Sequence, residues 1–172
     1  MLDINEHLFY NIIKIFFLNG FRRNGIMTVK EYLDQAYYLD KMIECKLRLS
    51  ESLGRQALRF GNAENVEGET DTYTKIRALE AEIDADIDRL VDIKKGIYEL
   101  TEKVGDLRQR MLLQLRYLRI VKGRRMTWAD IALYLGYDER WIMRLHRAAL
   151  ASAEKLYKET EPEKPSPTHV RT

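Results

Sequence analysis

The chain has 172 residues, of which 33% are charged and 45% hydrophobic, with only three prolines and nine glycines. This balance excludes a largely disordered chain and is typical of a helical protein with one domain or two small ones. The net charge of +2 is unevenly distributed: residues 64–88 hold nine acidic and two basic side chains, whereas residues 105–147 hold ten basic and four acidic ones. A locally basic carboxyl-terminal half is what a polyanionic partner requires.

Residues 1–26 contain the mostly apolar stretch Leu8–Leu18. A helix that crosses a bilayer needs about 20 apolar residues, so this stretch is too short. Asp3 and Glu6 stand where a secretion signal would carry basic residues. We therefore expect an amphipathic amino-terminal helix and no membrane association.

A capping-box sequence, Thr28-Val-Lys-Glu31, directly follows Met27 and predicts the start of a long helix. Two interpretations of residues 1–26 stay open, because the natural product either includes them or begins at Met27. The chain has one cysteine, Cys45, which excludes an internal disulfide; we expect it to be buried or half-buried in a protein of the bacterial cytoplasm.

Two long helices are predicted, over Thr28–Arg59 and Asp71–Lys103, joined by a loop over Phe60–Thr72. Apolar residues recur at spacings of three and four in both, except where Asp86 occupies an inward position. Helices of roughly 30 residues are on the order of 45 Å long. They predict an antiparallel hairpin, or coiled coil, over residues 27–104, which we expect to pair with a second copy or to fold onto the amino-terminal helix.

Gly105-Asp106 interrupts the pattern, and a third helix is predicted over Leu107–Val121. Its expected inward residues are Leu107, Met111, Leu115 and Leu118. The basic stretch Lys122–Arg125 reads as a loop that leads to the next helix.

Residues 126–150 read as two short helices joined by a tight turn. Thr127 can cap the first helix and Asp138 the second, while Gly136 stands where a positive φ is often needed. Arg140, Arg144 and Arg147 lie off the apolar face of the second helix, which is formed by Ile142, Leu145 and Ala149. This layout is typical of a helix-turn-helix, so we assign residues 105–157 to an all-α DNA-binding domain. Residues 158–172 are predicted to be a disordered tail.

The segments that carry a resemblance are Arg116-Tyr117, Thr127–Ala132, Leu135–Tyr137 and Arg144–Leu150. They resemble region 4 of bacterial sigma-70 factors, and more closely the phage late-transcription regulators of the ArpU and RinA type, over about Met27 to Tyr157. The resemblance implies a promoter-binding regulator, rather than a complete sigma factor, that acts with host RNA polymerase.

By position in that family, the residues that read DNA bases are Glu139, Arg140, Met143 and Arg144. Each arginine could donate two hydrogen bonds to a guanine edge, and Glu139 could accept one from a cytosine amine. The family usually has a basic residue in place of Glu139, which suggests a site other than the ordinary −35 element. The alternatives are salt bridges on a solvated face for the arginines, a helix-dipole role for Glu139 and simple exposure for Met143.

Phosphate contacts are expected from Lys122, Arg124, Arg125, Thr127 and Arg147, which would fix the register of the protein on DNA. Trp128 is interpreted as a packing residue, and Trp141 as either a packing or a DNA-contacting residue. His146 is expected to be a surface or half-packed side chain.

No pattern of metal ligands, cofactor-binding loop or catalytic pair stands out, so we expect no enzyme, metal or cofactor. Asp84–Asp88 begins like a calcium loop, but Arg89 and Lys95 replace its required glycine and acid. Besides the DNA-binding regulator, two alternatives stay open: a small DNA-packaging subunit of the terminase type, and a coiled-coil interaction protein that does not bind DNA.

Overall fold

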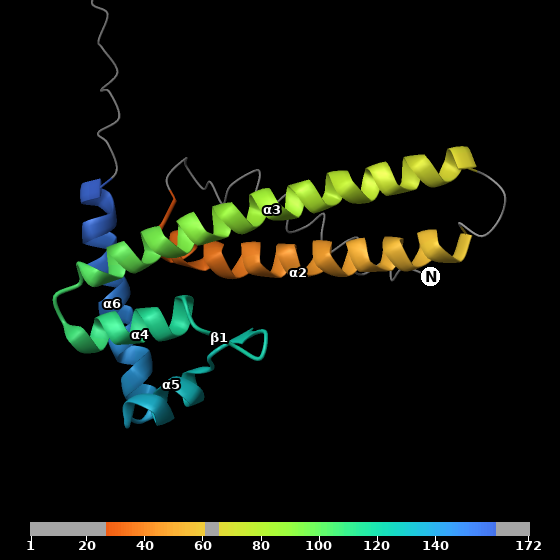
Figure 1. The fold of residues 1–172 in the computed structure, drawn as a ribbon. Coiled ribbons are helices and arrows are strands. Elements are labelled where there is room, and N and C mark those ends of the chain that lie inside the picture. The colour runs from red at the N-terminus through yellow and green to blue at the C-terminus, as the bar shows by residue number, and fades with distance from the viewer. Residues whose placement is uncertain (1–26, 61–65, 161–172) are drawn as a thin grey trace, which may run out of the picture.

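The computed structural model describes residues 27–60 and 66–160, which are built almost entirely of helices. Two long helices, α2 (Val29–Phe60) and α3 (Val66–Glu102), lie side by side, and three further helices gather at one end of them (Figure 1). These are α4 (Leu107–Tyr117), α5 (Trp128–Leu135) and α6 (Glu139–Thr160), and a pair of two-residue strands, β1 (Ile120–Val121) and β2 (Arg124–Arg125), lies between α4 and α5. The all-α prediction is therefore confirmed.

The start of α2 is fixed by the predicted capping box. The backbone N–H of Thr28 donates to Glu31 Oε2 at 2.7 Å, and the backbone N–H of Glu31 donates to Thr28 Oγ1 at 3.3 Å. The backbone N–H of Val29, also in the first turn, donates to the carboxylate of Glu154 on α6 at 3.0 Å. The amino terminus of α2 is thus attached to the last helix.

The two long helices run in opposite directions, as their ion pairs show. Lys94 of α3 lies 3.7 Å from Asp40 of α2, and Asp86 of α3 lies 2.7 Å from Lys46, which is farther along α2. The sequence predicted an inward position for Asp86. Its partner Lys46 is itself buried, with only 7% of the residue exposed, so the two charges neutralise each other between the helices. The buried apolar residues of α3 recur with heptad spacing along the same face; they are Ile76, Ile83, Leu90, Ile97 and Leu100.

Three predicted boundaries differ from the structure. α3 begins at Val66, inside the predicted loop, because extending a formed helix by a few residues costs little. The third helix ends at Tyr117 rather than Val121, because β1 and β2 pair antiparallel around Lys122 and Gly123, both with positive φ. α6 continues to Thr160, into the predicted tail. The remaining predictions for residues 1–26 and 161–172 fall outside the described residues.

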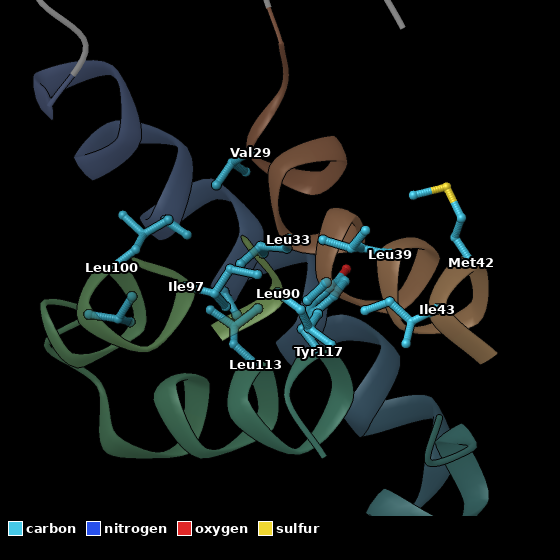
Figure 2. Close-up of a cluster of buried hydrophobic side chains, with 14 of the residues drawn as sticks. Val29, Leu33, Leu39, Met42, Ile43, Leu90, Ile97, Leu100, Leu113 and Tyr117 are labelled. Atoms are coloured by element: carbon cyan, nitrogen blue, oxygen red, sulfur yellow. The ribbon is translucent and has the colours of Figure 1, made fainter. Parts of the chain in front are cut away.

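A shared hydrophobic cluster joins the long helices to the carboxyl-terminal helices. Figure 2 shows side chains of α2, α3 and α4 converging, among them Leu33, Ile97 and Leu113. Ala149 and Ala153 of α6 belong to the same cluster and are fully buried. One continuous core therefore holds the base of the long helices and the middle of α6 together.

α4 lies between this cluster and a second one shared with α5 and α6. Leu113 packs into the first cluster, whereas Leu112 and Leu115 pack into the second. The predicted inward face of this helix is therefore partly wrong, since Leu107 is 62% and Met111 37% exposed. A helix that is buried on two sides does not show a single apolar stripe.

Cys45 is half-buried, as predicted. Among the helices of the described residues, none is long and apolar enough to cross a membrane.

Candidate nucleic-acid interface

The turn between α5 and α6 is built by residues that the sequence singled out. Thr127 Oγ1 accepts the backbone N–H of Asp130 at 3.1 Å, and Asp130 Oδ2 accepts the backbone N–H of Thr127 at 2.8 Å, which completes a capping box. The hydrogen bond from the Thr127 backbone N–H holds the pKa of Asp130 below its usual value. α5 ends at Leu135 and is capped by Gly136, whose φ of 73° is left-handed, as predicted.

The first turn of α6 is held by Asp138 and Tyr137. Asp138 Oδ1 accepts the backbone N–H of Trp141 at 2.8 Å, so the predicted cap is confirmed. The ring of Tyr137 stacks on that of Trp141 with centroids 3.9 Å apart. Trp141 is half-buried against the second cluster and therefore has a packing role. Trp128, predicted to pack, also lies against that cluster.

The two faces of α6 differ in chemistry. Ile142, His146 and Ala149 are buried on its inner face, where α6 contacts α4 and α5. Arg140, Arg144 and Arg147, spaced four and three residues apart, are all exposed on the outer face. Glu139 is exposed beside them, and Met143 is 37% exposed.

The outer arginines are not neutralised within the described chain. Across residues 27–60 and 66–160, the ion pairs within 4.0 Å include none to Arg140, Arg144 or Arg147. They join other residues, such as Lys158 with Glu154 farther along α6 and Arg124 of β2 with Asp130 of α5. The salt-bridge alternative for Arg140 and Arg144 is therefore not what these residues show. The face presents three cationic groups that remain free to donate hydrogen bonds to an anion.

The β1–β2 turn adds two exposed basic side chains, Lys122 and Arg124. The turn residues Lys122 and Gly123 have φ of 51° and 72°, which suits a two-residue hairpin turn. Arg124 donates to Asp130 at 3.1 Å but keeps 56% of its side chain exposed. Thr127, also predicted to contact phosphate, is exposed, and its hydroxyl is engaged in the capping box.

Arg125 lies inside the molecule, and this placement argues against its predicted phosphate role. Its guanidinium donates to Asp34 Oδ1 of α2 at 2.5 Å and lies 4.1 Å from the ring centroid of Tyr37. Both Arg125 and Asp34 have side chains that are only 14% exposed. The neighbouring β-strand residues alternate in direction, so Arg124 points outward where Arg125 points inward.

His146 is buried, and the expectation of a surface or half-packed side chain is wrong. Its Nε2 lies 3.0 Å from the hydroxyl of Tyr117, and its ring is 4.7 Å from that of Trp128. Burial, together with the nearby Arg116 guanidinium, lowers the pKa of His146 to about 4. Burial also raises the pKa of Tyr117 to about 12. Both groups are therefore neutral at pH 7.

Sequence reasoning missed the buried polar contacts made by Asp34 and Tyr117. Asp34 and Arg125 are 91 residues apart along the chain, so no spacing rule connects them. Tyr117 is 2% exposed and lies 29 residues before His146, so local spacing does not connect this pair either. Within the described part of the chain, no group of three or more His, Cys, Asp or Glu side chains is arranged to hold a metal ion.

Comparisons with protein-family models, with curated proteins and with solved structures found no match for this chain.

Proposed function

We propose that this protein is a sequence-specific DNA-binding regulator of transcription that uses α5, its turn and α6 as a helix-turn-helix. The observation that carries the proposal is the outer face of α6, where Arg140, Arg144 and Arg147 are exposed and have no carboxylate partner among the residues that the structure describes. The inner face of the same helix is anchored in two hydrophobic clusters, so the arginines project from a rigid support. A preorganised cationic helix is suited to the major groove of DNA.

In this mode, Arg140 and Arg144 read base edges, each able to donate two hydrogen bonds to guanine O6 and N7. Glu139 accepts from a cytosine amine, and Met143 contacts a thymine methyl group. Arg147, Lys122, Arg124 and the exposed Thr127 contact phosphates, which position the helix without reading sequence. Arg125 leaves the phosphate set because Asp34 occupies its guanidinium.

The resemblance to sigma region 4 and to phage regulators of the ArpU and RinA type favours a promoter as the target and host RNA polymerase as a partner. Activation of late genes of a phage or prophage, in the bacterial cytoplasm, is the regulatory role that this resemblance supports. The operator must be found by experiment, so the decisive test begins with selection of bound sequences from a random duplex library.

The test compares the selected duplex with a scrambled duplex in fluorescence-anisotropy titrations. For Arg140→Ala/Arg144→Ala we expect affinity for the selected site to fall by about 5- to 150-fold per arginine, because each bidentate contact contributes about 1–3 kcal/mol of discrimination. The matched control, Arg48→Ala/Arg55→Ala, removes the same charge from exposed positions of α2 and should change affinity little. Equal affinity and selectivity in the double variant and the wild type would refute the proposal.

A second measurement separates phosphate contacts from base contacts. Replacing Arg147 with alanine should weaken binding to the selected and scrambled duplexes alike and reduce the salt slope of log K by about 1. A loss confined to the selected duplex would move Arg147 to the base-reading set.

A further inference from the structure

α3 carries a second stripe of residues at heptad spacing, beside the one that packs on α2. Its members are Arg77, Glu80, Asp84, Ile87, Val91, Lys94 and Tyr98, which recur at alternating intervals of three and four. Ile87 is 40%, Val91 59% and Tyr98 51% exposed, so the apolar centre of this stripe faces solvent. The stripe lies one residue, or about 100°, around the helix from the buried one, which is the angle between two neighbours in a four-helix bundle.

α2 contributes an exposed leucine to the same face. Lys94 lies 3.7 Å from Asp40, and the helices run antiparallel, so a step of seven residues along each brings Leu47 opposite Ile87. Leu47 is 45% exposed. Leu47, Ile87 and Val91 therefore form one exposed apolar patch near the middle of the two long helices, which we call the Ile87 patch.

We propose that a second copy of this chain covers the Ile87 patch, with the two α3 helices antiparallel and a two-fold axis passing at Ile87. Such an interface uses the same surface on both copies, so each contact occurs twice. The stripe from Arg77 to Tyr98 is about 32 Å long, enough for a four-helix bundle of several layers.

Charge complementarity selects this occupant. With the axis at Ile87, a residue seven positions before it meets the residue seven positions after it on the other copy. Glu80 therefore faces Lys94 twice, and each Lys94 ammonium would lie between this Glu80 and Asp40 of its own copy, 3.7 Å away. Arg77 comes within one residue of the level of Tyr98, a pairing of a cation with an aromatic ring. Glu80 and Lys94 lie about 21 Å apart along one helix, so they meet only between copies. Within the described chain, Glu80 and Arg77 take part in none of the ion pairs, which leaves both for the second copy.

The inference goes beyond DNA binding and is tested without DNA, so its failure and that of the proposed function are distinguishable. The full-length protein is measured by sedimentation equilibrium, where we expect twice the chain mass of 20.4 kDa. Glu80→Lys and Lys94→Glu should each weaken the dimer by about two- to tenfold, because the pair occurs twice. The combined variant Glu80→Lys/Lys94→Glu should restore wild-type association.

Asp88→Lys and Lys95→Glu make the same charge changes at exposed positions of α3 off the stripe and should leave association unchanged. Circular dichroism of each variant checks that the helices are intact. A monomer at all concentrations, a ring of many copies, or single variants that the combination does not rescue would each overturn the proposal. A monomer would leave the patch to another protein or to another segment of this chain.

Crosslinking locates the axis independently. In a Cys45→Ser background, Ile87→Cys should form an intermolecular disulfide on mild oxidation, because a residue on the axis meets its own copy. Lys95→Cys, on another face of α3, should not. Equal crosslinking of the two variants would refute the placement of the axis at Ile87.

Discussion

Replacing Asp34 with alanine would leave the Arg125 guanidinium in a site where only 14% of its side chain is exposed. Arg125 donates to the Asp34 carboxylate at 2.5 Å and to its backbone oxygen at 3.3 Å, and it lies against the ring of Tyr37. Removing one partner of a buried pair costs about 3–5 kcal/mol when the pair is fully buried. Because both side chains keep some contact with water, we take the lower end, about 3 kcal/mol.

That loss is a large part of the 5–15 kcal/mol that holds a typical domain folded. In a chain of this size it should lower the melting temperature by about 6–12 °C. The assay is urea unfolding at pH 7, followed by circular dichroism. Asp71→Ala is the control, because it breaks a pair with Lys75 whose side chains are 65% and 71% exposed, and it should cost under about 1 kcal/mol.

The variant Asp34→Leu/Arg125→Met removes both charges and should recover most of the stability, because the cost lies in the unpaired cation rather than in the missing bond. If Asp34→Ala costs less than about 1 kcal/mol, or the double variant is as unstable as the single one, the interpretation of a buried pair is refuted. The double variant also tests DNA binding: a salt slope lower by about 1 would return Arg125 to the phosphate set.

Three further predictions concern stability. The pKa of His146 falls from 6.5 to about 4 on folding, so the unfolded chain takes up this proton first as the pH is lowered. The free energy of unfolding should therefore be highest above pH 6.5 and decrease by about 3 kcal/mol between pH 6.5 and 4. In urea titrations His146→Gln should remove this decrease, and a decrease that persists in the variant would exclude His146 as its source. Gly136→Ala should cost about 1 kcal/mol in thermal unfolding because φ is 73°, with Gly136→Asn milder; an unchanged melting temperature would contradict that account. Lys46→Met alone should destabilise the protein by about 2 kcal/mol, whereas Lys46→Leu/Asp86→Leu should be neutral or stabilising; a double variant as unstable as the single one would show that the pair itself is needed.

Local sequence signals predicted the capped helix ends well. Thr127, Gly136 and Asp138 all adopt the predicted capping roles, because caps depend on residues within three or four positions of one another. The capping box at Thr28 succeeded for the same reason. The exposure of Arg140 and Arg144 also followed from local spacing, since the apolar residues of α6 define its buried side.

The failures involve contacts between distant parts of the chain. The apolar stripe of α4 was wrong because this helix is buried between two clusters, so Leu112 and Leu113 point to different neighbours. Arg125 was expected beside Arg124 on the surface, but its partner, Asp34, comes from α2. His146 was expected nearer the surface, and its burial depends on Tyr117, 29 residues earlier. Periodicity within one helix holds no information about any of these neighbours.

Different parts of α6 make different contacts. Its first turns present the exposed arginines, whereas Ala149 and Ala153 lie in the core at the base of α2 and α3, and Glu154 holds the start of α2. The long helices are consequently a rigid arm fixed to the helix that bears the arginines, rather than a tethered module. A force applied to the far end of α2 and α3 would therefore tilt α6 together with them as a rigid body.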